Sequence, residues 1–353
     1  MAERAHQATQ AAGEPRRDAA PPPRTPRASP MRGTYAALDL GTNNCRLLIA
    51  RPAGDGFVVI DAFSRIVRLG EGLAATGQLS DAAMDRAVAA LAICSDKLKR
   101  RNVTLVRSVA TEACRRATNG RDFVARVLAE TGIQLQIITA EQEARLAVTG
   151  CHALLEPGTG PALVFDIGGG STELVLLDGE SGGAPHVGDW FSAPWGVVSL
   201  SESEPHVGDS EEALRAAYGR MRARVAEAFA PFAATLKARG VGDGGRLLGT
   251  SGTVTTLASL HLELPNYDRR AVDGLIVPAG AMRTLSQRLA GMSVGERARL
   301  ACIGHERADL VVAGCAILEV ILDLWPAERL SVADRGIREG ILRTLMAHEF
   351  RSS

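Results

Sequence analysis

The chain has 353 residues, of which 46% are hydrophobic and 23% charged, a composition typical of a soluble globular protein. Lysine and arginine number 40, as do aspartate and glutamate, so the net charge gives no general attraction to nucleic acid polymers or anionic membranes. This length favours two domains over a single core. No apolar run is long enough for a membrane-spanning helix. The six cysteines lack metal-binding spacing, and we expect reduced thiols in a cytoplasmic protein.

The first 33 residues differ in composition from the rest of the chain. They are rich in Ala, Pro and Arg and lack hydrophobic periodicity, so we predict a disordered tail over 1–33. A signal peptide needs an apolar core, which this segment lacks. Met31 directly precedes the first expected strand and is a second candidate for the translation start.

The first half of the chain predicts the order β-β-β-α-β-α-β. Ser80 is expected to cap the first long helix. Together these elements predict an α/β domain over 34–150. The expected strands are 35–40, 45–50, 57–61, 103–110 and 133–137, and the expected helices are 81–101 and 122–131.

The second half repeats this order with additional helices, which indicates an internal duplication of one α/β unit. Strands are expected at 162–167, 173–177, 246–249 and 328–332, and helices after Ser210 and at 254–260, 278–291, 294–300, 304–324 and 336–350. We predict a hinge at 151–161, a second domain over 151–345 whose final helix packs back on the first, and a tail over 346–353.

Each half contains an aspartate at the end of a strand, followed by a turn of small residues. Asp39 precedes Gly41, Thr42, Asn43 and Asn44, and Asp166 precedes Gly168, Gly169, Gly170, Ser171 and Thr172. Such turns let backbone N–H groups approach an anion closely, and Mg²⁺ (or Mn²⁺) binds carboxylates together with phosphate oxygens. The two turns therefore predict opposed phosphate-binding loops with Asp39 and Asp166 at a metal. The alternative is that each aspartate only closes an Asx turn.

Several longer segments resemble one family. They are Ala110-Thr111-Glu112-Ala113-Cys114-Arg115-Arg116-Ala117-Thr118-Asn119, Ala140-Glu141-Gln142-Glu143-Ala144-Arg145-Leu146, Asp166 to Glu173, Gly249-Thr250-Ser251-Gly252-Thr253 and Asp334-Arg335-Gly336-Ile337-Arg338-Glu339-Gly340. Taken together, they resemble the exopolyphosphatase/guanosine pentaphosphate phosphohydrolase (Ppx/GppA) family of the acetate and sugar kinase/heat-shock/actin superfamily. The resemblance covers about residues 35 to 345.

This resemblance implies an α/β fold of two duplicated ribonuclease-H-like (actin-like ATPase) domains around an interdomain cleft. It also implies a homodimer and Mg²⁺-dependent release of terminal phosphate from inorganic polyphosphate or of the 5′ γ-phosphate of pppGpp. By motif, Glu143 matches the catalytic glutamate, and Asp166 and Glu173 match acids beside the metal and the attacking water. Arg115 and Asn119 match phosphate contacts. We expect Ser251, Gly252 and Thr253 to line the cleft as further phosphate contacts.

The chain departs from the family pattern at three positions and in length. Asn44 stands where a serine is frequent, Ala140 where a glycine is usual, and Gln142 where an acid is frequent. The amide of Asn44 still donates, and Glu143 is retained. Long members carry an additional C-terminal helical domain that would begin about where this chain stops, which puts tight binding of long polymers in doubt.

A hydrolase must aim a water at the terminal phosphorus, and Glu143 is expected to orient or deprotonate that water. Two other classes remain open: a sugar- or acetate-type kinase, and a regulator that binds polyphosphate or nucleotide without turnover. Since polyphosphate and pppGpp both end in a phosphoanhydride, the choice between them also stays open.

Overall fold

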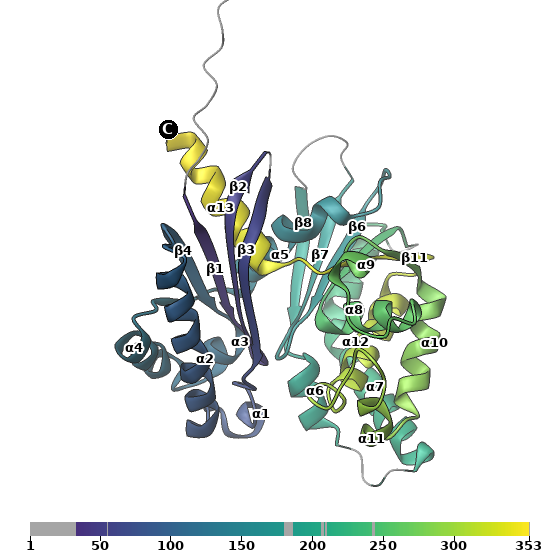
Figure 1. Ribbon diagram of the computed structural model, residues 1–353. Helices are drawn as coiled ribbons and strands as arrows, with labels where there is room; N and C mark the ends of the chain where they lie inside the picture. Colours follow the sequence, from purple (N-terminus) through teal and green to yellow (C-terminus); the bar gives the residue numbers. More distant parts are fainter. Residues whose placement is uncertain are drawn as a thin grey trace, which may run out of the picture. The chain divides into compact units, whose positions relative to one another are not determined.

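Two β-sheets of the same strand order organise the chain (Figure 1). The computed structural model describes residues 33–54, 56–179, 186–205, 208, 210–241 and 244–352. The predicted disordered tail, 1–33, lies outside the described residues except for Gly33. None of the helices in the described ranges is both long and apolar enough to cross a membrane.

The first sheet has the order β3-β2-β1-β4-β5. Its strands are β1 (Tyr35–Leu40), β2 (Asn44–Ala53), β3 (Gly56–Ile66), β4 (Leu105–Ala110) and β5 (Leu135–Ile137). The central strand, β1, pairs antiparallel with β2 and parallel with β4. It is buried along nearly its whole length, because helices cover both of its faces. This explains why its sequence is a continuous apolar run.

The second sheet repeats this arrangement as β8-β7-β6-β9-β11, with β10 added at the edge. Its strands are β6 (Ala162–Ile167), β7 (Thr172–Asp178), β8 (His186–Ala193), β9 (Arg246–Thr250), β10 (Ile276–Pro278) and β11 (Arg329–Ala333). Like β1, β6 pairs antiparallel with the strand that follows it and parallel with β9. The equivalent order confirms the predicted duplication of a ribonuclease-H-like unit.

The helices lie on both sides of these sheets. They are α1 (Leu73–Thr76), α2 (Asp81–Arg100), α3 (Glu112–Arg116), α4 (Gly120–Thr131), α5 (Ala140–Cys151), α6 (Val197–Ser203), α7 (Glu211–Ala238), α8 (Gly252–His261), α9 (Arg269–Val272), α10 (Ala279–Ala290), α11 (Val294–Ala298), α12 (Val311–Leu324) and α13 (Ile337–Ser352), with a 3₁₀ turn at His152–Leu154. Ser80 and Ser210 cap α2 and α7 as predicted, each accepting a backbone N–H. The expected helix 304–324 begins only at Val311.

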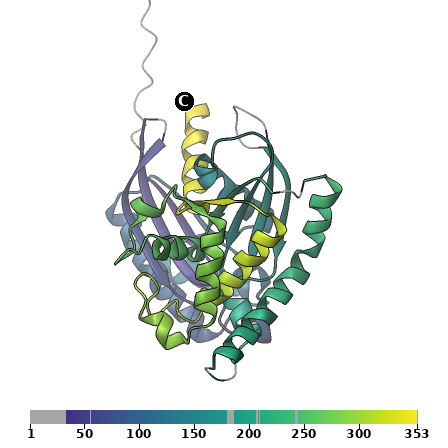
Figure 2. The ribbon, with the colours of Figure 1, turned by 90° about the vertical axis from the view of Figure 1, so that its right-hand side faces the viewer.

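The core of the second half is built around α12. Every residue of this helix from Val311 to Leu322 is buried, because α7, α10 and α8 pack around it. The long α7 runs along one side of this layer (Figure 2). A helix that is apolar on nearly all sides is expected in such a position, and its one buried carboxylate, Glu319, lies 3.2 Å from Arg222 of α7.

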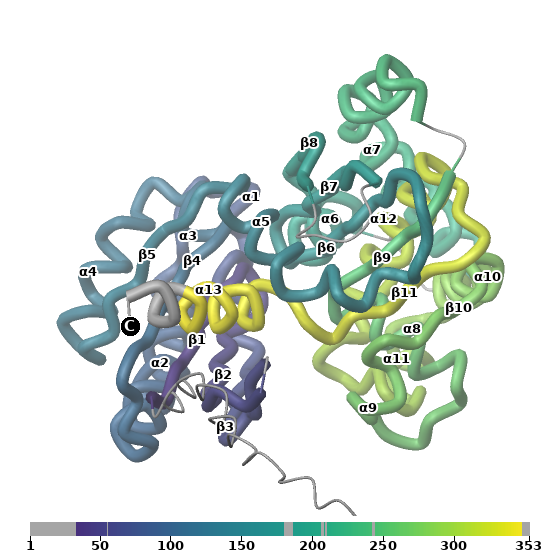
Figure 3. Tube along the Cα trace, turned by 90° about the horizontal axis from the view of Figure 1, so that it is seen from above, coloured from purple at the N-terminus to yellow at the C-terminus, as the bar shows by residue number. Residues whose placement is uncertain are grey.

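Helices α5 and α13 are exchanged between the two sheets. We call the described chain up to Cys151 the first half and the remainder the second half. α5, which ends the first half, packs on β6, β7 and β8, whereas α13, which ends the second half, packs on β1, β2 and β4 (Figure 3). These contacts of α13 agree in direction with the expectation that the final helix packs back on the first domain, which stays a prediction. The sequence predicts a tail from 346, but α13 continues to Ser352.

The two exchanged helices also cross each other on glycines. A Cβ atom on Gly150 would lie 2.0 Å from the carbonyl oxygen of Gly336, and one on Gly340 would lie 2.0 Å from that of Leu146. No larger side chain fits at either position without moving backbone. The close crossing fixes α5, and with it Glu143, relative to α13.

Candidate active site

The two Gly-rich turns have the same construction and touch each other. The N–H of Gly41 donates to the carbonyl of Asn44, and that of Gly168 to the carbonyl of Ser171, each at 2.9 Å. A Cβ on Gly169 would lie 3.0 Å from the backbone nitrogen of Asn43. The contact explains why small residues are required where the turns meet.

A cavity of about 510 Å³ opens beside these turns, a size typical of small-molecule sites. The first residues of α8 and α13 also line it, so helix N-termini add N–H donors for an anion. Its lining includes these predicted site residues: Asp39, Gly41, Thr42, Asn43, Asn44, Glu143, Asp166, Gly168, Gly169, Gly170, Ser171, Glu173, Ser251, Gly252 and Thr253.

Three buried oxygens of the first turn lack hydrogen-bond partners within the described part of the chain. They are Oδ1 of Asp39, Oγ1 of Thr42 and Oδ1 of Asn43. Buried polar atoms are normally paired, and these three belong to residues of the cavity wall. The turn is therefore built to contact a bound group.

Four carboxyl groups meet at this cavity. Burial raises the pKa of Asp39, and burial together with Glu143 raises the pKa of Asp166 to about 7. Burial and then Asp166 raise the pKa of Glu173 to about 7, while burial and then Glu173 raise that of Glu143 well above its usual value. Like charges confined in this way favour either protonation or a bound cation.

The residues present fit a divalent cation by their chemistry, since Asp39 offers an unpaired buried oxygen. Among the described residues, no group of three or more His, Cys, Asp or Glu side chains is arranged to hold a metal ion by itself. Mg²⁺ is commonly held by one or two carboxylates, with waters and substrate phosphates completing its shell.

Glu143 lies in the first turn of α5, and the local sequence fixes it there. Thr139 caps the helix in a reciprocal pair with Gln142, whose side chain accepts the N–H of Thr139 at 3.1 Å. Gln142, one of the departures from the family pattern, thus forms a capping box. Glu143 is only 6% exposed.

Arg115 contacts Glu143 instead of lining the cavity. Its Nη1 lies 3.0 Å from Oε2 of Glu143 and donates to the carbonyl of Ile138 at 2.8 Å, and the other side of the guanidinium pairs with Glu112. Both edges of the guanidinium are thus engaged by carboxylates, and the contact of Arg115 with phosphate stays a prediction.

Two further predicted phosphate contacts also have other partners. The amide of Asn119 accepts the N–H of Leu79 and donates to its carbonyl, both at 2.9 Å, so it joins the segment before α2 to α4. The hydroxyl of Thr172 donates to the carbonyl of Trp195 at 2.7 Å, and the residue is fully buried. Neither residue lines the cavity.

Sequence reasoning did not identify the arginines of the cavity wall as site residues. The wall includes Arg46, Arg269, Arg307, Arg335 and Arg338. Arg46 could have been found, because it lies two positions beyond Asn44 in β2, and alternate residues of a strand share a face. The others lie more than 200 positions further along the chain, and only the folded structure brings them to the turns.

Comparison with known proteins identifies the family. Residues 48–349 match the Ppx/GppA phosphatase family. The chain belongs to the Ppx/GppA phosphatase family. It is 33% identical over 327 residues to Exopolyphosphatase 2 of Mycobacterium tuberculosis, covering 88% of this chain and 98% of that one.

Solved structures agree with the Ppx/GppA assignment. The Aquifex aeolicus family member superimposes with a TM-score of 0.71 at 28% identity, covering 90% of this chain and 98% of that one. An exopolyphosphatase from Cytophaga hutchinsonii shares the fold with a TM-score of 0.79 at 24% identity, covering 89% and 98%. As a Ppx/GppA member, the chain is a phosphoanhydride hydrolase.

Proposed function

We propose that this protein is an exopolyphosphatase that releases the terminal phosphate of inorganic polyphosphate, with pppGpp as a second substrate. The observation that carries the proposal is the place of Glu143, buried beside two phosphate-type turns with its carboxylate held by Arg115. The relative with 33% identity is named an exopolyphosphatase, which supports polyphosphate as the main substrate.

In the proposed mechanism, Glu143 orients a water for in-line attack on the terminal phosphorus and accepts its proton. A base must be ionised to do this, and burial opposes ionisation. The positive charge of Arg115 favours the carboxylate of Glu143 and lowers its pKa. Correctly placed general bases contribute about 10²–10⁴-fold to turnover.

The phosphate chain is bound by neutral and positive donors. Residues of both Gly-rich turns line the cavity, and Arg46 and Arg338 supply positive charge on its wall. Phosphoryl transfer depends mainly on such positioning and charge neutralisation. Burial lowers the pKa of Arg338, so an anion in the cavity would stabilise its charged form.

We further propose that Asp39 and Asp166 hold Mg²⁺ or Mn²⁺, with Glu173 beside the cation and the attacking water. The unpaired oxygen of Asp39 and the raised pKa values of Asp166 and Glu173 support this. When bound, the cation neutralises charge on the phosphate oxygens. A homodimer in the cytoplasm is part of the same proposal, and light scattering after size exclusion tests the oligomeric state.

The deciding experiment measures phosphate release from short polyphosphate, long polyphosphate and pppGpp, each with Mg²⁺, Mn²⁺ or EDTA. We expect metal-dependent release, with kcat/KM ranking the three substrates. A parallel reaction with labelled ATP and acetate or a sugar tests the kinase alternative. Transfer of label to the acceptor would indicate a kinase instead of a hydrolase. Tight binding of substrate without turnover would indicate a regulator.

A further inference from the structure

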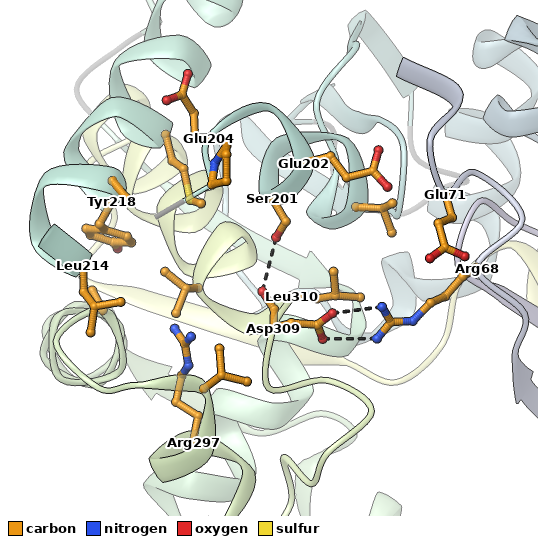
Figure 4. A pocket seen from close by; sticks show the side chains of 17 residues that line it. Arg68, Glu71, Ser201, Glu202, Glu204, Leu214, Tyr218, Arg297, Asp309 and Leu310 are labelled. Atoms are coloured by element: carbon orange, nitrogen blue, oxygen red, sulfur yellow. Dashed lines mark hydrogen bonds and ion pairs between the residues drawn. The ribbon is translucent and has the colours of Figure 1, made fainter. Parts of the chain in front are cut away.

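An ion pair joins the two halves beside the active-site cavity. Nη1 of Arg68 lies 2.9 Å from Oδ2 of Asp309, and its Nη2 lies 3.3 Å from Oδ1. Figure 4 shows the two side chains facing each other, Arg68 from the first half and Asp309 from the second. The same Nη2 donates to the carbonyl of Glu306 at 3.4 Å. The contact is therefore a two-point bridge between segments far apart in sequence.

On the first half, the segment of Arg68 is bonded directly to the first Gly-rich turn. The N–H of Arg68 donates to the carbonyl of Asn43 at 3.0 Å, and that of Gly70 to the carbonyl of Thr42 at 2.9 Å. Arg68 has a φ of 46°, a conformation that few non-glycine residues adopt. Arg86 supports it by donating to the carbonyls of Val67 and Arg68.

On the second half, Asp309 connects through α6 to the second turn. The hydroxyl of Ser201 in α6 donates to the carbonyl of Asp309 at 3.2 Å. At the start of α6, the N–H groups of Val197 and Val198 donate to the carbonyls of Gly168 and Gly169, at 2.9 and 2.8 Å. The segment of Arg68 is thus hydrogen-bonded directly to the first Gly-rich turn, and Asp309 is linked to the second turn through the short helix α6.

A second contact crosses at the same place. The N–H of Gly72 in the first half donates to Oε1 of Glu202 in α6 at 3.0 Å. Both contacts border a second cavity of about 300 Å³, and Leu310 lines this cavity as well as the active-site cavity. The bridge therefore forms part of the wall behind the catalytic site.

The bridge is suited to repeated opening. The side chains of Arg68 and Asp309 are 35% and 38% exposed, and exposed pairs are weak and screened by salt. A pair of this kind can hold the turns together while substrate is bound and separate during release.

We propose that Arg68 and Asp309 are positioning residues that set the spacing of the two Gly-rich turns across the cleft. This inference rests on the proposed function only for its kinetic part. Neither residue lines the active-site cavity, so both act through the turns. Loss of the bridge lets the turns move apart and weakens their joint hold on the phosphate chain.

The test is a charge-reversal series with R68D, D309R and the double variant R68D/D309R. For each single reversal we expect KM for polyphosphate to rise about fivefold, as breaking an exposed pair allows, with a smaller change in kcat. The double variant restores the opposite charges and is expected to return KM to within about twofold of wild type. R68Q removes the charge alone and serves if R68D does not fold.

A matched control is the pair Arg126–Asp85, which is separated by 2.7 Å and lies within the first half, with Arg126 also 35% exposed. Its swap, R126D/D85R, is expected to leave KM unchanged. Hydrogen exchange of segments 41–44 and 168–171 without substrate gives a second readout that does not need activity. Faster exchange in both turns of R68D, reversed in the double variant, supports the bridge even if polyphosphate is not the substrate. Unchanged exchange and KM in R68D and R68Q, or no rescue in the double variant, would overturn it.

Discussion

Arg46 and Glu173 occupy the same position of the two duplicated hairpins. Arg46 lies opposite Asp39 in the β1–β2 pair, and Glu173 lies opposite Asp166 in the β6–β7 pair. The first hairpin is therefore electrically balanced, whereas the second places two acids side by side. At this position Arg46 adds positive charge for a phosphate, whereas Glu173 adds negative charge next to Asp166 and the proposed cation.

This difference predicts opposite effects of neutralising the two residues. Glu173→Gln is expected to raise the Mg²⁺ concentration for half-maximal activity by at least about tenfold, as changes around metal ligands commonly do. Arg46→Gln should instead raise KM for polyphosphate with little change in the Mg²⁺ requirement. Mg²⁺ titrations of phosphate release at saturating substrate measure the metal requirement, and polyphosphate titrations at saturating Mg²⁺ measure KM. Identical Mg²⁺ titration curves for Glu173→Gln and wild type would contradict the proposed place of Glu173 beside the cation.

Glu143→Gln is expected to lower kcat by at least about 100-fold, because the amide cannot accept the proton of the attacking water. Substrate binding should be retained, as the turns are unaffected. Glu141→Gln is the matched control, since Glu141 lies in the same helical turn and pairs only with Arg145 in the described structure. Phosphate release measures this turnover. A rate for Glu143→Gln near that of the wild type would remove the assignment of Glu143 as the base.

Arg115→Gln is expected to shift the pH dependence of kcat/KM. Arg115 lowers the pKa of Glu143 against the effects of burial and Glu173, so loss of its charge raises that pKa further. The acidic limb of the profile should move to higher pH, and Arg115→Lys should move it less. Arg116→Gln, at an exposed neighbouring position whose arginine lies 3.8 Å from Glu112, is expected to leave the profile in place.

The raised pKa values also predict how stability depends on pH without metal. In the folded protein the pKa of Asp166 is raised from 3.8, and that of Glu173 from 4.5, each to about 7. Between the unfolded and the folded pKa values, the folded state binds more protons than the unfolded state. The free energy of unfolding therefore falls as pH rises from about 4 to about 7. Thermal unfolding in EDTA should show this fall, and Asp166→Asn should reduce it. If these two groups instead made the melting temperature in EDTA rise with pH across this range, the raised pKa values would be contradicted.

Tyr267 predicts a difference between the two proposed substrates. Tyr267 is 43% exposed and lines the active-site cavity, and a base stacked on an aromatic ring gains about 1–3 kcal/mol. Tyr267→Leu is therefore expected to lower kcat/KM for pppGpp about tenfold while leaving polyphosphate, which has no base, nearly unchanged. Tyr267→Phe keeps the ring and serves as control. Equal losses for both substrates would exclude stacking.

Local sequence predicted the hairpins and the position of Glu143 well, because apolar runs, small turn residues and a helix cap are adjacent in the chain. It did not predict β8, whose burial shows no regular alternation. It also did not predict the partners that Arg115 and Asn119 have within the structure, Glu143 and Leu79, which are 28 and 40 positions away. Side-chain partners at such separations depend on packing that no local pattern records.

The exchange of α5 and α13 has a consequence for biosynthesis. All strands of the first sheet have been made once the ribosome passes Ile137, but the helix that covers one face of β1 starts only at Ile337. Until then the nascent chain presents an uncovered apolar surface, which is a site for chaperones or aggregation. Catalytic competence thus arises in a late step, when the carboxyl-terminal helix docks onto a sheet that was synthesised first.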